Sequence, residues 1–253
     1  MTSLNQTEGL SIVIPTYNER ENIAELLGEL RRIAPRLKRP YEIVLVDDHS
    51  PDGTGDIAER TAHGLGLGVR VLSRDGERSM GGATAAGVRA CSWDLVCVMD
   101  ADLSHPPSLI PEMVESLDGA DGVVASRYVP GARIESWPVV RHVISYVATV
   151  LARSTLHLRC RDPLSGFFLF RRSLLEQVAI TGDGNKPLLE VLVGAKPVVN
   201  EVPYHFRNRK NGRSKLTAGN IAEFLRLVAV LRSGLRKGIS ESSRSGTPET
   251  RRH

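Results

Sequence analysis

The sequence has only three cysteines, Cys91, Cys97 and Cys160, and no CxxC pair. An odd number without paired spacing argues against a disulfide framework and a cysteine zinc site, so we expect reduced, mostly buried thiols. The chain also lacks a run of about 18 apolar residues, so no membrane-spanning helix is expected. Its first ten residues lack the basic and apolar segments of a signal peptide. We therefore expect a cytoplasmic protein.

Two common nucleotide-binding motifs are absent as well. The small-residue segment 78–87, RSMGGATAAG, fits neither the GxxxxGK[ST] spacing nor the GxGxxG spacing. These mismatches argue against ATP hydrolysis and dinucleotide binding, and we expect the segment to pack a helix closely on a sheet.

Positive charge is mild overall but concentrated in one segment. The 253 residues carry a net charge of +4, and segment 205–215 holds five Lys/Arg residues and no acid. Such a patch is typical of a site for phosphate groups or an anionic surface, with a solvated loop as the alternative. Nucleic-acid binding would need aromatic side chains among the basic ones, and Phe206 alone does not supply them. We expect no nucleic-acid partner.

Short, continuous apolar runs recur along the first half of the chain, each followed by turn residues. Helical patterns lie between them, including one in 19–33 with Asn18 as the expected cap. This alternation predicts a doubly wound α/β sheet, in which ligands bind beyond the carboxyl ends of the strands. The expected strands are 11–15, 42–48, 69–73, 94–100 and 121–126.

The second half has a different pattern. Segments 138–158 and 217–236 have the spacing of amphipathic helices, and 162–172 reads as a turn followed by an aromatic strand. Their apolar faces with basic flanks are typical of helices at a membrane surface. Packing against the sheet or against a membrane-protein partner is the alternative.

Two carboxylates, Asp100 and Asp102, follow the fourth expected strand in VCVMDADLSHPP. At a strand end, alternate acids can converge on a hard divalent ion such as Mg²⁺ or Mn²⁺ that is shared with substrate phosphates. A structural turn and a general acid/base pair are the alternatives. In VDDHSPDGT, Asp47 and Asp48 occupy an equivalent position, where an acid can accept hydrogen bonds from a nucleobase.

The chain contains, in this order, the segments IVIPTYNERENI, VDDHSPDGT, DADLSHPP, SRY, DPLSGFFLFRR and RKNGRSKL. Their order resembles that in inverting GT-A glycosyltransferases of family 2, and more narrowly the polyprenol-phosphate (dolichol-phosphate) mannosyltransferases. The resemblance covers residues 10 to about 235. It implies a GT-A fold, a Rossmann-like, mostly parallel sheet flanked by helices, with C-terminal amphipathic interface helices. We expect a catalytic domain over 1–216, an interface helix over 217–237 and a disordered tail over 238–253.

The resemblance also implies roles for individual residues. Asp100 and Asp102 would bind the metal, with Ser104 as a candidate third ligand where relatives often carry Gln. Asp102, Arg127, Arg141 and Arg209 would be catalytic. Arg127, Arg141 and Ser145 would hold the acceptor phosphate. The expected nucleotide-sugar residues are Pro15, Tyr17, Glu19, Asp47, Asp48, Asp100, Ala101, Asp102, Lys186, Arg209 and Lys215.

The implied reaction moves mannose from GDP-mannose to a polyprenyl monophosphate at the cytoplasmic face of the membrane. UDP-glucose is the alternative donor. A phosphate acceptor is already largely ionised at neutral pH and needs no general base. This agrees with the absence of a persuasive Ser/His/Asp constellation, and we expect His49, His105 and His157 to be turn, cap or surface residues.

Overall fold

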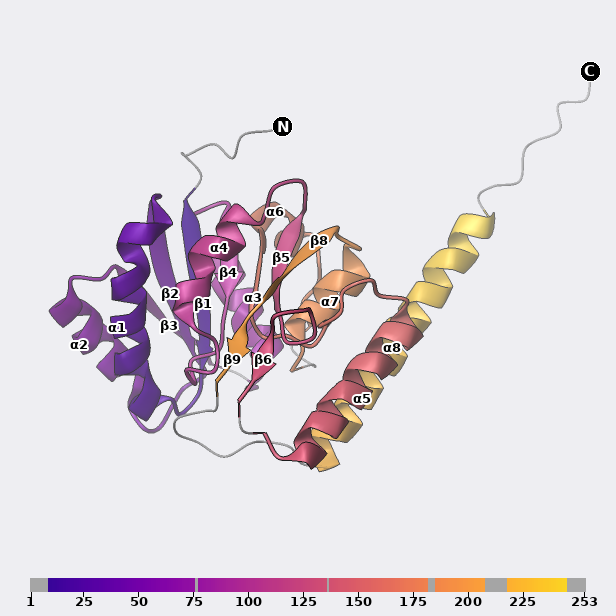
Figure 1. Cartoon of the computed structure of the whole chain (residues 1–253), viewed down its shortest axis with the longest axis horizontal. Helices are drawn as coiled ribbons and strands as arrows, with labels where there is room; N and C mark the ends of the chain where they lie inside the picture. The colour runs from indigo at the N-terminus through magenta and orange to yellow at the C-terminus, as the bar shows by residue number, and fades with distance from the viewer. Residues whose placement is uncertain (1–8, 76, 136, 182–184, 208–217, 245–253) are drawn as a thin grey trace, which may run out of the picture.

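The structure is a computed structural model that describes residues 9–75, 77–135, 137–181, 185–207 and 218–244, with only the backbone path given for 236–244. Its centre is a seven-stranded sheet in which β7 alone runs antiparallel to its neighbours (Figure 1). The strands, in spatial order, are β3 (Val69–Ser73), β2 (Tyr41–Asp47), β1 (Leu10–Thr16), β4 (Leu95–Val98), β7 (Phe168–Arg171), β5 (Gly122–Ser126) and β8 (Val199–Pro203).

The mostly parallel sheet predicted from the sequence is confirmed. Strands β1, β4 and β5 are buried on both faces, as their continuous apolar runs indicate, whereas β3 at the sheet edge is only partly buried. Strand β8 was not expected, because its sequence VNEVP is polar and its residues are only partly buried at the sheet edge. A second, two-stranded sheet pairs β6 (Arg133–Ile134) with β9 (His205–Phe206).

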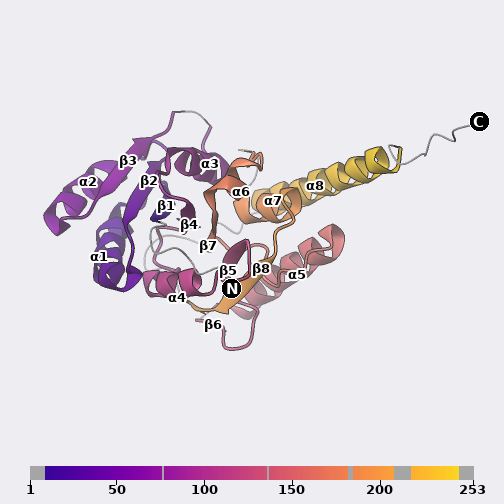
Figure 2. The same cartoon turned by 90° about the horizontal axis from the view of Figure 1, so that it is seen from above.

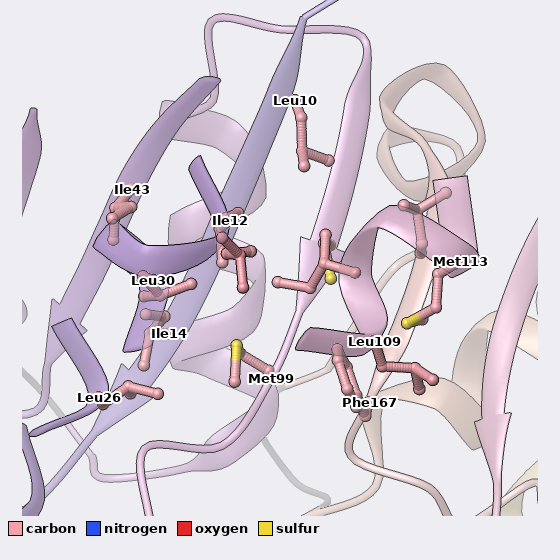
Figure 3. Packing of buried hydrophobic residues seen from close by; sticks show 14 of the residues in the cluster. Leu10, Ile12, Ile14, Leu26, Leu30, Ile43, Met99, Leu109, Met113 and Phe167 are labelled. Carbon is pink, nitrogen blue, oxygen red and sulfur yellow. The ribbon is translucent and has the colours of Figure 1, made fainter. Parts of the chain in front are cut away.

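Helices cover both faces of the large sheet (Figure 2). One face packs under α1 (Arg20–Leu37), α2 (Thr54–Leu65) and α4 (Ile110–Glu115), which follows the short 3₁₀ turn η1 (Pro107–Leu109). Figure 3 shows side chains of this core, where Leu26 and Leu30 of α1 lie near Ile14 of the sheet. The other face packs under α3 (Met80–Ala90), α6 (Arg172–Glu176) and α7 (Pro187–Gly194).

The close packing expected of segment 78–87 is present. A Cβ atom at Gly87 of α3 would overlap the side chain of Val13 on β1 and lie 3.1 Å from Val46 on β2. Glycine therefore lets α3 lie against the sheet, and the helix begins with the side chain of Ser79 accepting the N–H of Gly82 at 3.0 Å.

Two long helices form a third part of the structure. Helix α5 (Val139–Leu156) packs beside α8 (Ala218–Arg244), and both contact α7 through a small apolar cluster (Figure 1). Helix α8 is longer than expected, because residues 238–244, predicted to be disordered, continue its backbone to Arg244. Within the described residues, no helix combines the length and hydropathy needed to cross a bilayer.

The predicted Asn18 cap of the first helix is wrong. Glu19 is the N-cap residue of α1 and its side chain makes no capping hydrogen bond, while Asn18 is left-handed with φ 57°. The side chain of Asp52 accepts the N–H of Arg20, the first residue of the helix, at 3.2 Å. The reason is tertiary: the N–H groups of Asn18 and Glu19 donate to Ser50 and Thr54 in the loop after β2, at 3.0 Å each.

Candidate active site

Three loops at the carboxyl edge of the sheet form the candidate site. They follow β1, β2 and β4, and the strand order reverses around β1, which is where doubly wound sheets bind ligands. Each loop turns through one left-handed residue that is not glycine: Asn18, His49 and Leu103, with φ of 57°, 55° and 63°. Such residues cost energy and cluster where a loop must present side chains in one fixed geometry.

Asp47 ends β2 and ties the first two loops together. Its carboxylate accepts the hydroxyl of Thr16 at 3.1 Å and the backbone N–H of Ser50 at 2.9 Å. Thr16 is its register partner on β1. Asp47 is buried, so these bonds fix its orientation at the crevice where a nucleoside is expected.

Asp48 forms a two-pronged ion pair with Arg74, which sequence reasoning did not identify. Nε and Nη2 of Arg74 donate to the two carboxylate oxygens at 2.6 and 2.9 Å. The same carboxylate accepts the N–H of Ser79 at 3.1 Å. The hydrogen bond to Asp48 raises the pKa of Arg74. Asp48 thus anchors the loop between β3 and α3, and its side chain is a positioning group for that loop.

Tyr17 is the first residue after β1 and is half-buried. The exposed side chain of Arg78 places its guanidinium 4.1 Å from the centre of the Tyr17 ring. Tyr17 therefore has a cationic neighbour from the loop anchored by Asp48. Of the other expected donor residues in this first loop, Pro15 is buried in β1, and the carboxylate of Glu19 accepts the side-chain amide of Asn22 at 2.7 Å.

The carboxylates of Asp100 and Asp102 follow β4 with the buried Ala101 between them. Asp102 is buried, and its Oδ1 accepts the N–H and the hydroxyl of Ser104 at 3.1 and 2.6 Å. The turn that was the alternative interpretation of this pair is therefore present. Ser104, 1% exposed, acts in this geometry as a positioning group for Asp102.

The donor set fits a hard divalent ion that is shared with a substrate. Among the described residues, no cluster of three or more His, Cys, Asp or Glu side chains could hold a metal. Two strand-end carboxylates suffice when diphosphate oxygens and waters complete the coordination shell. An ion at Asp100 and Asp102 would therefore depend on the substrate for its remaining ligands.

His105 lies in the loop after β4, as expected of a turn residue, but it is buried with 2% exposure and is not at the surface. Its Nδ1 accepts the backbone N–H of Asp100 at 3.0 Å. The expectation holds for the other two histidines: His49 is an exposed turn residue, and His157 is the left-handed C-cap of α5.

Arg127 follows β5 at the same edge of the sheet and is 10% exposed. Its Nε and Nη2 donate to Asp162 at 2.8 and 2.7 Å, and its backbone N–H donates to the same carboxylate at 2.9 Å. Burial by itself lowers the pKa of Arg127, but the charge and hydrogen bonds of Asp162 outweigh it and the pKa is raised. Arg127 is therefore a fixed cation, held by an acid that sequence reasoning had not assigned.

The other two expected acceptor residues lie near Arg127. The guanidinium of Arg141 lies 4.1 Å from the Trp137 ring centre, and that of Arg127 lies 5.9 Å from it. The hydroxyl groups of Tyr128 and Ser145 share a hydrogen bond of 2.8 Å. The structure thus gathers Arg127, Arg141 and Ser145 around two aromatic side chains at the start of α5.

The two halves of the site are within electrostatic range of each other. Burial raises the pKa of Tyr204, while Arg127 lowers it and the carboxylates of Asp162 and Asp100 raise it. Tyr204 is 3% exposed, so these charges act across a region with little water. Ring contacts link the same groups: the Arg127 guanidinium lies 5.7 Å from the centre of the Phe206 ring, whose centre lies 6.0 Å from that of His105, the neighbour of Asp100.

Three expected residues are placed less directly. Lys186 precedes α7 beside Asn185, whose side-chain amide donates to Glu223 of α8 at 3.0 Å. That Lys186 lies near the nucleotide-sugar donor stays a prediction. Arg209 and Lys215 lie outside the described residues.

The residues that sequence reasoning missed are Arg74, Arg78 and Asp162, together with the burial of His105. Arg74 and Arg78 lie in a loop that departs from the family pattern, so nothing local assigned them. Asp162 begins DPLSGFFLFRR, a segment used for the resemblance, but its partner lies 35 positions away. That separation hides the pair from any local pattern.

Comparison with known proteins agrees with this geometry. The profile described as "Glycosyl transferase family 2" matches residues 11–179. The chain belongs to this family. The site loops after β1, β2, β4 and β5 all lie inside the matched segment, so the paired carboxylates and Arg127 are part of the family domain.

Curated relatives extend the likeness towards the C-terminus. A dolichol-phosphate mannosyltransferase of Pyrococcus furiosus is 41% identical over 87% of this chain, which spans 62% of that relative's length. A protein of the same name from Saccharomyces cerevisiae is 34% identical over 87% of this chain and 86% of its own length. The polyprenol monophosphomannose synthase of Mycolicibacterium smegmatis is 33% identical over 90% of this chain and 88% of its own length.

Solved structures share the fold at low identity. The glucosyl-3-phosphoglycerate synthase of Mycobacterium tuberculosis, determined with Mn²⁺, UDP and phosphoglyceric acid, aligns with a TM-score of 0.66. The alignment is 20% identical and covers 96% of this chain and 80% of that structure. At this identity, the likeness shows a shared fold alone.

Proposed function

We propose that this chain transfers mannose from GDP-mannose to a polyprenyl monophosphate, with inversion at the sugar carbon. One observation carries the proposal: the carboxylates of Asp100 and Asp102 lie at the same edge of the sheet as Arg127. Arg141, at the start of the partly apolar helix α5, lies near Arg127. The names of the curated relatives support mannose as the sugar and a dolichol or polyprenol phosphate as the acceptor.

The donor would lie in the crevice between the β1, β2 and β4 loops. Tyr17 and the oriented carboxylate of Asp47 would contact its nucleoside, with the Asp48 anchor behind them. Asp100 and Asp102 would hold Mg²⁺ or Mn²⁺, which would stabilise the charge that develops on the leaving diphosphate. Lys186, Arg209 and Lys215 are proposed to contact its phosphates.

The acceptor phosphate would bind beside β5. Arg127 presents a guanidinium whose Nε and Nη2 are held by Asp162, which leaves Nη1 for another anion. Arg141 is stacked beside Trp137, and Ser145 adds a hydroxyl. These cations would offset the repulsion between two phosphate-bearing substrates and orient the acceptor oxygen for in-line attack on C1.

No proton acceptor is required for this reaction. The attacking atom is a phosphate oxygen that is already ionised at neutral pH. Bond formation to C1 and departure of the nucleoside diphosphate conserve charge without a general base. His105, buried behind Asp100, is therefore not needed as a base.

A membrane surface is the partner proposed for α5. Seven exposed apolar side chains project within about 140° of arc around this helix, as 100° per residue places them. They are Val139, Val140, Val143, Tyr146, Val147, Val150 and Leu151, with exposed fractions from 37% to 77%. Seven water-exposed apolar side chains on one face, next to Arg141 and the proposed acceptor site, favour docking on lipid. The face would lie on the cytoplasmic side, where a reducing environment agrees with the three free, buried cysteines.

The central test is product formation. The protein is incubated with a polyprenyl phosphate, Mg²⁺ or Mn²⁺, and either GDP-mannose or UDP-glucose, and lipid-linked sugar is measured. We expect product with GDP-mannose, loss of product with a chelator, and little product with the Asp102→Asn variant. Product only with UDP-glucose, or no product from a folded protein with either donor, would contradict the proposal.

Membrane docking is tested by flotation with anionic vesicles. Val143→Asp and Val147→Asp should abolish co-flotation, because each places a charge on the apolar face. Val198→Asp, at an equally exposed valine before β8, is the matched control and should still float. Equal flotation of all three variants would argue against α5 as the docking surface.

A further inference from the structure

The imidazole of His105 contacts Asp100 at two points. Its Nδ1 accepts the backbone N–H of Asp100 at 3.0 Å, and its Nε2 lies 3.8 Å from Oδ2 of the same residue. We propose that His105 is a positioning residue that sets the orientation of the Asp100 carboxylate for the metal. This inference rests on the metal site of the proposed function.

The hydrogen bond to the backbone fixes which ring nitrogen carries the proton. An amide N–H can only donate, so Nδ1 must be the unprotonated acceptor. The neutral ring then carries its proton on Nε2, the nitrogen nearest the Asp100 carboxylate. One ring thereby binds the main chain of Asp100 through Nδ1 and places the protonated Nε2 3.8 Å from its carboxylate.

Aromatic side chains prevent the ring from rotating. Phe167 stacks on it with centroids 5.2 Å apart and an interplanar angle of 23°. Tyr204 and Phe206 meet it edge-on at 5.9 and 6.0 Å. With 2% exposure, His105 has no room for another rotamer, so its two contacts with Asp100 are geometrically fixed.

Gly166 allows the carboxylate and the ring to approach the chain before β7. A Cβ atom there would lie 2.9 Å from Oδ2 of Asp100 and 3.0 Å from Cε1 of His105. Any larger residue would press on both groups at once. The close approach at this glycine is independent of the His105 hydrogen bond and points to the same arrangement.

The loop conformation serves the same contact. Leu103 is left-handed with φ 63° and 6% exposed, an uncommon state for a bulky residue. The turn brings His105 back beneath Asp100 while Ser104 holds Asp102. The carbonyl of Ser104 also accepts the N–H of Arg207 at 3.2 Å, which ties the loop to the chain after β9.

A purely structural histidine would contribute only the packing of its ring to the core. Substitutions can distinguish this packing role from the positioning of Asp100, because each replacement keeps a different part of the imidazole. Phenylalanine keeps the aromatic contacts and removes both nitrogens. Asparagine can replace Nδ1 as acceptor for the Asp100 N–H, and glutamine can place an N–H near the position of Nε2.

The test measures Mn²⁺ affinity by electron paramagnetic resonance on the full chain with GDP present. We expect His105→Phe to weaken Mn²⁺ binding by about 10- to 100-fold, as other supporting groups of metal ligands do. His105→Asn and His105→Gln should each recover part of the loss. Ile110→Val, which removes a buried methylene without touching Asp100, controls for a general loss of stability and should bind Mn²⁺ as the wild type does.

Turnover at rising Mn²⁺ concentration gives a second readout. A positioning role predicts that excess Mn²⁺ restores part of the activity of the His105 variants but none of that of Asp102→Asn. If His105→Phe fails to fold, the asparagine and glutamine variants decide the question. Unchanged Mn²⁺ affinity in every folded His105 variant would overturn the inference alone. Absence of Mn²⁺ binding by the wild type would instead contradict the proposed metal site, and the inference with it.

Discussion

Arg127 and Asp162 form a buried ion pair in which two guanidinium nitrogens and one backbone N–H all bind a single carboxylate. Asp162 is fully buried, and Arg127 is the cation that faces it at 2.7 Å. The pair joins the end of β5 to the turn before β7, which places the proposed acceptor cation on the rigid sheet. An arginine on an exposed surface, without a buried carboxylate partner, would lack this fixed orientation towards the proposed acceptor phosphate.

Replacing Asp162 should therefore affect both stability and acceptor binding. We expect Asp162→Asn to lower the free energy of unfolding by about 3–5 kcal/mol, because it leaves a buried cation without its counter-charge. The KM for polyprenyl phosphate should rise more than the KM for the donor. Urea unfolding and steady-state kinetics measure the two effects.

Arg127→Lys keeps the charge but loses the two-pronged geometry, so it should also raise the acceptor KM. An unchanged acceptor KM in both variants would contradict the assignment.

Ser104 and Asp102 should differ in the size of their effect. Removing the Ser104 hydroxyl deletes a charge-assisted hydrogen bond to Asp102, and we expect Ser104→Ala to lower kcat by about tenfold. Asp102→Asn removes the carboxylate itself and should cost about 100-fold or more. Steady-state rates at saturating Mn²⁺ measure both variants. If Ser104→Ala were as inactive as Asp102→Asn, a direct metal contact by Ser104 would be the better interpretation.

The stacking of Arg78 on Tyr17 should influence the donor and not the acceptor. An exposed cation–π contact contributes about 0.5–1 kcal/mol, so Arg78→Ala should raise the donor KM by about two- to fivefold. The acceptor KM should stay as it is in the wild type. Arg89→Ala, an exposed arginine at the far end of α3, is the matched control. A donor KM equal to that of the control would show that the contact has no role in binding.

Glu42 should contribute acid-sensitive stability far from the site. Burial opposes its ionisation, but hydrogen bonds from Ser92 and Ser11 and the charge of Arg70 outweigh burial and lower the pKa of Glu42 from 4.5. A lowered folded-state pKa means that the stabilisation is complete above the unfolded value and is lost as the pH falls through the folded value. At pH 7, Glu42→Gln should cost about 1–3 kcal/mol of unfolding free energy.

The difference between wild type and Glu42→Gln should shrink once the pH falls below 4.5. Urea unfolding at neutral and acidic pH measures it. Glu59→Gln, at an exposed position on α2, should change stability little at either pH. A gap between wild type and Glu42→Gln that does not change with pH would contradict the role assigned to this carboxylate.

The sequence by itself determined the strands that carry the site and the loops that follow them. Continuous apolar runs predicted β1, β2 and β4, because buried parallel strands need apolar residues on both faces. Turn residues after each run located Asp47, Asp100 and Asp102 at the carboxyl edge. These features are local, because the strands and the loops after them depend on residues that are neighbours in the sequence.

Tertiary structure alone decided the contacts that join segments far apart in the chain. The Asn18 cap failed because Ser50 and Thr54, from another loop, already bind the N–H groups at the start of α1. Asp162 meets Arg127 only because β7 lies antiparallel beside β5, and Gly166 lets His105 and Asp100 meet beside β7. Hydrogen bonds and ion pairs depend on distances of a few ångströms between segments far apart in the chain. Strand order and packing set those distances, and no local pattern of residues records them.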